Sequence, residues 1–198
     1  MASGSKERIE AVSADLLARH GYNGMGLKAL SQAAGLPYGS IYHHFPGGKE
    51  EIAASAIANL GAVVAQLLES LFASVPADRA VVAMFDYMAG RLEASDWAEG
   101  CVIGTPAQDG AVDSPIVREA CEAALGQMTT VIGRALVDAG VAPGTADGLA
   151  VTVVAAYEGA TMLARVQRSA APLHTTATTL ADLLRATTAA PTTPPTSP

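Results

Sequence analysis

The sequence predicts an all-α protein of about nine helices, arranged as a small head and a larger body. Apolar residues recur at helical spacing along nearly the whole chain, and no stretch alternates in the way a half-buried strand does. Half of the 198 residues are hydrophobic and only 16% are charged, so a sizeable core is easily filled. We expect a three-helix head over residues 1–48, a body over 49–188 and a disordered Pro/Thr-rich tail over 189–198.

Three short helices are expected in the head. The first covers SKERIEAVSADLLARHG and stops at Gly21. The second ends at Gly35, which is free to adopt the positive φ of a tight turn between two helices. The third has Pro37 in its first turn and ends before Pro46. If Ile41 points inward, the polar and aromatic side chains around it must largely face outward.

The body is expected to hold five long helices and one short one. Pro76 breaks the first of them, and Ser114 with the following proline is a good helix start. Thr145 is expected to cap a very apolar helix. The Gly-rich stretch 95–114 reads as a loop with one short helix at most. The expected long helices are 49–74, 77–94, 115–140, 145–168 and 173–187.

Charge is distributed unevenly between head and body. The formal net charge is −7, yet residues 1–49 hold five Lys/Arg against three Asp/Glu, while the remainder holds seven against sixteen. A mildly basic head on an acidic body leaves a nucleic-acid partner open for the head. Two cysteines suggest no disulfide framework, and neither a signal peptide nor a membrane-spanning run is evident. We therefore expect a cytoplasmic protein with no membrane association.

One segment resembles a known family. GLKALSQAAGLPYGSIYHHFPGGKEEIAASAI, residues 26–57, is similar to the DNA-binding head of TetR-type transcriptional repressors. The resemblance rests on Ile41-Tyr42-His43-His44-Phe45 followed by Lys49, and it covers residues 6–58. The Pro-Gly-Gly-Lys-Glu segment after the third helix resembles a branch that includes regulators of multidrug-resistance genes. The head is therefore expected to be a helix-turn-helix whose third helix lies in a DNA major groove.

The resemblance implies roles for individual head residues. Base edges would be approached by Lys28, Tyr38, Gly39, Ser40 and His43, and phosphates would be held by Tyr42, His44 and Lys49. A helix N-terminus at Lys49 itself attracts an anion, so Glu50 and Glu51 should point away from it. Many relatives have Thr or Ser before the second helix. This chain has Gly26, which offers no hydroxyl.

The helix after residue 145 predicts a dimer interface. ADGLAVTVVAAYEGATMLARV is apolar on almost every side, and its small residues permit close helix packing. Burial inside the monomer is the alternative explanation. Members of the TetR family dimerise through their last two long helices, which favours the interface. The expected interface residues are Val153, Ala156, Gly159, Ala160, Leu163, Leu180 and Leu184.

Large, adaptable side chains on the central helices suggest a cavity for an apolar or amphipathic effector. The candidate lining residues are Met84, Phe85, Met88, Trp97, Cys101, Met128, Tyr157 and Met162. At helical spacing such residues also form ordinary cores, and that alternative stays open. Cys101 and Cys121 are read as small buried apolar groups, with a thiol sensor as the alternative.

Together these features predict a ligand-responsive repressor. A homodimer would bind a palindromic double-stranded DNA operator and be released by a small apolar inducer, without a cofactor. Two other classes of protein are alternatives. An enzyme would use His43, His44 or Cys101, but these residues do not have the spacing of a known catalytic motif. Adjacent histidines on a helix point about 100° apart, which disfavours a metal site at His43 and His44. A helical binding protein that does not bind DNA is the runner-up.

Overall fold

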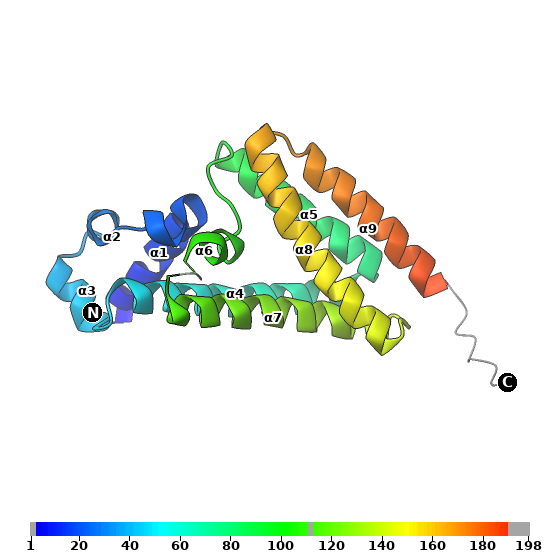
Figure 1. Ribbon diagram of the computed structural model, residues 1–198, viewed down its shortest axis with the longest axis horizontal. Helices are drawn as coiled ribbons and strands as arrows, with labels where there is room; N and C mark the ends of the chain where they lie inside the picture. Colours follow the sequence, from blue (N-terminus) through cyan, green and yellow to red (C-terminus); the bar gives the residue numbers. More distant parts are fainter. Residues whose placement is uncertain (1–2, 111–112, 190–198) are drawn as a thin grey trace.

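The computed structural model describes residues 3–110 and 113–189, and within these ranges it contains nine α-helices and no strand (Figure 1). This confirms the predicted all-α class. Residues 190–198 of the expected tail lie outside the described residues. In chain order the helices are α1 Ser3–Gly24, α2 Leu27–Ala34, α3 Tyr38–His44, α4 Lys49–Ser74, α5 Ala77–Ala94, α6 Gly104–Asp109, α7 Pro115–Asp138, α8 Pro143–Gln167 and α9 Ala171–Ala189.

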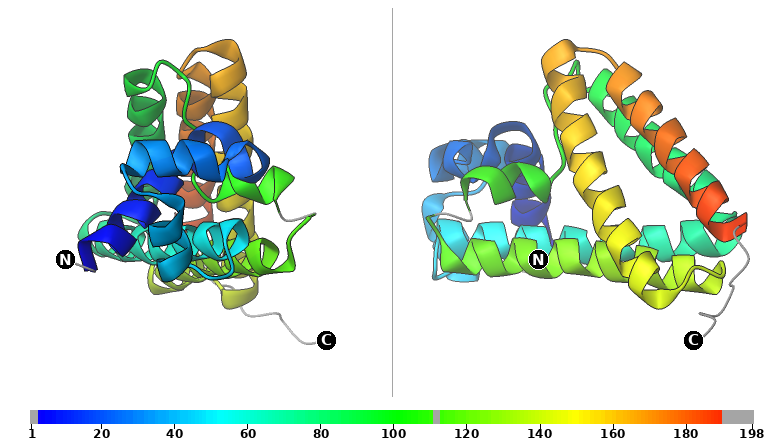
Figure 2. Two further views of the ribbon diagram at one scale, coloured as in Figure 1. Left: turned by 90° about the vertical axis from the view of Figure 1, so that its left-hand side faces the viewer. Right: turned by 45° about the vertical axis from the view of Figure 1, so that its right-hand side comes forward.

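The body consists of two sets of packed helices. Helices α4 and α7 run side by side along the long axis, and α5, α8 and α9 pack together and lean away from them (Figures 1 and 2). The head, α1–α3, sits at one end of the α4–α7 pair. Helix α6 lies between the head and α7. The long helix α4 therefore belongs to both parts, since α1 packs on its first turns and α7 along its length.

The turn between α2 and α3 closes as a compact unit. Gly35 adopts a left-handed conformation with φ of 60°, as predicted. Leu36 N–H donates to Ser31 O at 3.1 Å, and Ser31 Oγ donates to Leu36 O at 2.6 Å. Leu30 and Ile41 are fully buried on either side of the turn. The sequence of this turn thus fixes the angle at which α3 leaves the head.

Three predicted helix starts differ from the structure by one or two residues, and the last of them is that of α9, which begins at Ala171 rather than at residue 173. Pro37 is the residue before α3 rather than part of its first turn, with φ of −69° and an extended ψ of 155°. Helix α8 begins at Pro143 after an extended Ala142, so Thr145 does not cap it. Proline explains the second difference, because its restricted φ suits the first helical position and its ring pushes the preceding residue out of the helical region.

Helix α1 is interrupted at the glycine where the sequence predicted its end. Gly21 has φ of 68° and ψ of −175°, and one further turn follows it. The carboxylate of Asp109, at the end of α6, accepts hydrogen bonds from the N–H groups of Tyr22 at 2.9 Å and Asn23 at 2.8 Å. Asp109 thereby caps the second piece of α1 and ties it to α6.

Two helices are long and apolar enough to cross a membrane by length and composition: Lys49–Ser74 and Pro143–Gln167. The first of them contains Lys49, Glu50, Glu51 and Glu69, so it shows no uninterrupted apolar run in the sequence. One or two such helices are weak evidence for a span, because the core helix of a soluble protein meets the same criterion. Here both pack against neighbouring helices of the body.

Replacing Gly21 by alanine should destabilise the fold by at least about 2 kcal/mol, because this backbone conformation is nearly exclusive to glycine. A Cβ at this position would also lie 2.5 Å from Asp109 Oδ2. Gly90→Ala is the matched control: it lies on α5 with no heavy atom within 4 Å, and should stabilise by roughly 0.5–1 kcal/mol. Urea unfolding of both variants measures the difference. Equal stabilities would contradict this account of the break.

Candidate nucleic-acid interface and body cavities

Helix α3 presents an exposed aromatic face. Tyr38 and Tyr42 are 45% and 47% exposed, and His43 is exposed beside them. Ile41 on the opposite side is fully buried. A seven-residue helix with this division places its hydroxyl and imidazole groups toward solvent, as the sequence predicted if Ile41 points inward. Such groups can hydrogen-bond phosphates and base edges.

The remaining head residues assigned to DNA lie around this face. Lys28 is exposed near the start of α2, and Gly39 is exposed on α3. Ser40 and His44 are half-buried, and the two histidine rings meet edge to face at 5.3 Å between centroids. Gly26 precedes α2 without a side-chain cap. Among the described residues no cluster of three or more His, Cys, Asp or Glu has metal-binding geometry.

The N-terminus of α4 differs from the expectation. Lys49 Nζ turns back over the Tyr22 ring, 4.4 Å from its centroid, and lies 3.4 Å from Asn23 O. Glu51 was expected to point away, but its Oε2 accepts a hydrogen bond from Gly47 N–H at 2.7 Å. The cause is the unsatisfied N–H groups at a helix start, which a nearby carboxylate readily occupies. The positive end of the helix dipole is therefore partly compensated within the chain.

Two stretches of the chain match known protein families. Residues 9–56 match the family described as bacterial regulatory proteins, tetR family. Residues 76–179 match the C-terminal domain of LmrA/YxaF-like transcriptional regulators, which covers more than half of the chain. The chain belongs to the TetR family. It is a transcriptional regulator with a helix-turn-helix head, and the resemblance of that head to TetR-type regulators is confirmed. The branch indicated by the Pro-Gly-Gly-Lys-Glu segment stays a prediction.

Individual relatives agree along the whole chain. The HTH-type transcriptional regulator LmrA of Bacillus subtilis (strain 168) is 28% identical over 182 residues, which is 91% of this chain and 97% of LmrA. A TetR transcriptional regulator from Legionella pneumophila superposes with a TM-score of 0.82 at 22% identity, covering 90% of this chain and 96% of its own. A TetR regulator from Chloroflexus aurantiacus J-10-FL gives 0.78 at 28% identity, covering 93% and 96%. These relatives are transcriptional regulators rather than enzymes. Regulators of the family bind DNA and act as dimers with small-molecule effectors.

The body contains an apolar cavity of about 340 Å³ between α4, α5, α7 and α8. Three of the predicted effector-binding residues, Met84, Met128 and Tyr157, line it. Tyr87 completes the wall from α5. Four residues of α4 that the sequence analysis did not assign also line this cavity, namely Val64, Leu67, Leu68 and Leu71. Only the three-residue and four-residue spacing of these α4 residues hinted at a shared face.

A second cavity, of about 290 Å³, lies between the segment after α5 and the C-terminal half of α8. Its lining includes the predicted residues Trp97, Cys101 and Met162. Phe85 and Met88 line neither of these two cavities. They are buried in the core, and the Phe85 ring packs edge to face against Tyr157 at 5.3 Å. The predicted set is thus divided between two cavities and the core, because helical spacing does not show which side of a helix faces a void.

Glu158 is the unexpected residue of the second cavity. It comes from α8 and carries a buried Oε1 that accepts no hydrogen bond from any group in residues 3–110 or 113–189. Its other oxygen, Oε2, lies 1.9 Å from where a Cβ on Gly104 would stand. Burial raises the pKa of the Glu158 carboxyl, and the neighbouring Cys101 thiol partly opposes that rise. The sequence signal was an acid in the middle of the stretch 149–164, which holds no other charged residue.

Both cysteines are buried and unpaired. Burial, and then the charge of Glu158, raises the pKa of the Cys101 thiol far above its ordinary value. Burial also raises the pKa of Cys121 to about 11. A thiol that stays protonated at neutral pH reacts slowly with oxidants. The chemistry of these sites therefore favours the interpretation of small buried apolar groups over a thiol sensor.

The predicted interface residues fall into two groups. Val153, Ala160, Leu180 and Leu184 are buried within the protomer, where α8 and α9 pack on their neighbours. Ala156 and Gly159 are half-buried, and Leu163 is exposed. The predicted set therefore mixes the inward stripe of these helices with the outward one, and only the outward residues remain candidates for an interface. The exposed apolar side chains of α8 are Val151, Met162, Leu163 and Val166.

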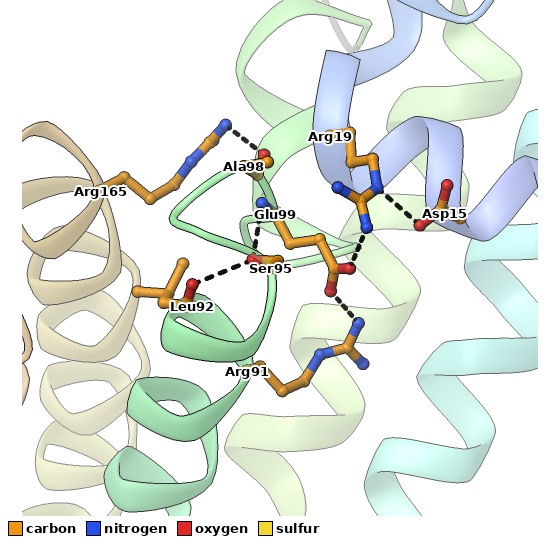
Figure 3. A network of polar contacts seen from close by, with 8 residues as sticks. All are labelled: Asp15, Arg19, Arg91, Leu92, Ser95, Ala98, Glu99 and Arg165. Atoms are coloured by element: carbon orange, nitrogen blue, oxygen red, sulfur yellow. Dashed lines mark hydrogen bonds and ion pairs between the residues drawn. The ribbon is translucent and has the colours of Figure 1, made fainter. Parts of the chain in front are cut away.

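A network of charged groups joins the head to the wall of the second cavity (Figure 3). Glu99 lies just before Cys101, and its Oε1 accepts from Arg19 Nη2 of α1 at 2.7 Å. Arg91 of α5 binds the other carboxylate oxygen. Gly100 N–H donates to Ala18 O of α1 at 2.9 Å. Residues 99 and 100 therefore contact α1 through both side chain and backbone, while residues 97, 100 and 101 face the cavity.

We predict that Glu158→Gln stabilises the protein at neutral pH by about 1 kcal/mol, since it removes a buried charge whose Oε1 has no hydrogen-bond partner and whose carboxyl is otherwise met by the weak Cys101 thiol donor. Because the folded-state pKa of Glu158 is raised, the stability that its protonated form confers is complete below the unfolded-state pKa. That stability is lost as pH rises through the folded-state value. The advantage of the variant should therefore vanish toward about pH 4, the ordinary range of Glu. Thermal unfolding across pH measures it, with the exposed Glu93→Gln as control; a constant difference at every pH would contradict the assignment.

Proposed function

We propose that this regulator is a repressor that binds a palindromic operator as a homodimer and leaves it when a small apolar or amphipathic effector enters the body. The proposal places its action in the cytoplasm, on DNA, and assigns no catalytic activity to the chain. Family membership supplies the class of function. The observation that carries the DNA-binding role is the exposed face of α3, with Tyr38, Tyr42 and His43 turned outward on a helix whose position is set by a buried Ile41.

The proposed path from effector to DNA runs along α4. The C-terminal half of this helix lines the apolar cavity with Val64, Leu67 and Leu71. Its first residue, Lys49, adjoins the end of the recognition helix, and the Tyr42 ring lies 3.4 Å from where a Cβ on Gly48 would stand. An effector that fits the cavity better in one orientation of α4 than another shifts the head. By thermodynamic linkage, DNA and effector then weaken each other's binding by the same factor.

The proposed dimer face is the exposed stripe of α8. Val151, Ala155, Gly159 and Leu163 follow one another at four-residue spacing, so they share one side of the helix. Val166 at its end is 80% exposed. A contiguous apolar stripe rich in small residues is typical of an interface rather than of a free surface. Helix α9 adds Leu183, which is 44% exposed.

Lys28→Ala should weaken binding to the operator about tenfold and reduce its preference over scrambled DNA, because a base-contacting lysine contributes roughly 1–3 kcal/mol of discrimination. Tyr42→Ala should weaken binding to both DNAs, since a phosphate contact carries no sequence information. Arg134→Ala is the matched control for charge: it removes an exposed cation from the C-terminal half of α7.

Fluorescence anisotropy on DNA from the region upstream of the gene, at two salt concentrations, measures these effects. The wild-type affinity should fall steeply with salt. Absence of any preference over scrambled DNA at low salt would favour a helical binding protein that has lost DNA recognition. An equal loss in Arg134→Ala would mean that only overall charge was being measured.

Leu163→Glu should convert the dimer to monomer at micromolar concentration, because it places an unpaired carboxylate in the proposed interface. Burying such a charge costs about 3 kcal/mol or more, equivalent to at least about a hundredfold in the dissociation constant. Val63→Glu is the control: Val63 on α4 is 49% exposed against 47% for Leu163, so each protomer tolerates the change equally. Sedimentation equilibrium gives the mass. A dimeric Leu163→Glu protein would place the interface elsewhere.

A further inference from the structure

We propose that the second cavity, between residues 97–108 and α8, binds a small organic compound that carries a protonated amine, with the Glu158 carboxylate receiving the ammonium group. This site is separate from the apolar cavity, and it does not depend on the proposed operator or inducer. Throughout this subsection it is called the Glu158 cavity, and it is defined by Trp97, Gly100, Cys101, Thr105, Gln108, Glu158, Thr161, Met162, Arg165 and Val166.

Glu158 brings a buried carboxyl group to the wall of this cavity. Its Oε1 is buried and has no hydrogen-bond donor among the described residues, and the side chain lines the cavity. The Cys101 thiol, a weak donor, hydrogen-bonds the carboxyl but carries no charge, so the carboxylate is buried without a cation or a strong donor. Such burial is costly in general, so natural chains rarely keep such a group without a use. No described lysine, arginine or histidine forms an ion pair with it. A ligand ammonium supplies both the charge and the N–H donors that the Glu158 carboxylate lacks.

The wall of the Glu158 cavity combines apolar and polar side chains. Trp97, Met162 and Val166 provide an apolar side, while Thr105, Gln108 and Thr161 contribute polar groups. A tryptophan face attracts a cation as well as an apolar body. The volume of about 290 Å³ lies at the lower end of the range for small-molecule sites, so the compound is small.

The position of Arg165 sets the orientation of the compound. Its Nη2 donates to Ala98 O at 3.0 Å, which holds the guanidinium against the rim of the cavity. Seven residues separate Glu158 from Arg165, which corresponds to two helical turns, or about 10 Å along the same face of α8. The ammonium therefore belongs at the Glu158 end, away from the like charge. A hydroxyl or carbonyl oxygen at the other end of the compound would meet a donor.

The wall of the Glu158 cavity also includes a strained turn. Asp96 and Trp97 adopt positive φ values of 52° and 65°, a conformation that non-glycine residues seldom take. Residues 99 and 100, which follow it, contact Arg19 and Ala18 of α1. A compound that contacts Trp97 and Gly100 therefore contacts the same short segment that binds α1 through residues 99 and 100. A shift of this segment on binding would move α1 directly, by a route separate from α4.

The test compares two probes of equal shape, 4-phenylbutylamine and 4-phenyl-1-butanol, by isothermal titration calorimetry on the full chain at neutral pH. The amine should bind at least about tenfold more tightly than the alcohol, since it alone forms a charge-assisted hydrogen bond. Glu158→Gln should abolish that preference, because the amide keeps the shape and loses the charge. Glu158→Asp keeps the carboxylate and should retain the preference, which decides the matter if the amide variant does not fold. The exposed Glu93→Gln, on α5, is the charge-matched control and should bind as the wild type does.

The proposal is overturned if the wild type shows no preference for the amine, binds neither probe at millimolar concentration, or keeps its preference in Glu158→Gln. Operator binding is measured by anisotropy on the same preparations. Absence of sequence-selective DNA binding in the wild type would count against the proposed repressor function. The preference for the amine over the alcohol alone decides whether the Glu158 cavity binds an ammonium group.

Discussion

The attachment of α1 to the body is the constraint on which the placement of the recognition helix depends. Helices α2 and α3 pack mainly against α1 and each other, so they follow wherever α1 goes. Helix α1 in turn is held by α4 and by α6. At α6, one carboxylate, that of Asp109, accepts two backbone N–H groups from the piece of α1 that follows Gly21. The interruption of α1 at Gly21 thereby provides the backbone N–H groups through which Asp109 connects the head to the body.

Much of the fold could be predicted because its signals are local. Gly35 adopts the left-handed turn that its position indicated, and Ser114 caps α7 through a contact with Val117 N–H at 3.4 Å. The exposed face of α3 followed from one inward residue, Ile41. Such features depend on neighbours a few positions away, so spacing and residue type suffice to find them. The predicted start of α8 was wrong because Pro143, which suits the first helical position, lies within one turn of Thr145 and begins the helix before it.

The rest depends on contacts between residues far apart in the sequence. Asp109 and Tyr22 are 87 positions apart, and Arg19 and Glu99 are 80 apart. Helical periodicity does not show which charged side chain binds which distant partner. The same limit applies to the cavities: Phe85 and Met84 are adjacent on α5, but one is core and the other lines a void. Tertiary packing, which leaves gaps only where side chains of neighbouring helices fail to interdigitate, decides between them.

Three consecutive residues of helix α8 face three different surroundings. Tyr157 faces the apolar cavity, Glu158 faces the polar one, and Gly159 lies on the stripe proposed for the partner. Consecutive residues of a helix point about 100° apart, so three neighbours divide the full circle among three surroundings. A helix used on every side has no face left for charged solvent-exposed residues, which explains why its sequence is apolar almost throughout. It also means that a compound in either cavity presses on the helix proposed to hold the dimer together. In the proposed dimer, packing against α8 couples the spacing of the two recognition helices to both proposed sites without a further signalling element.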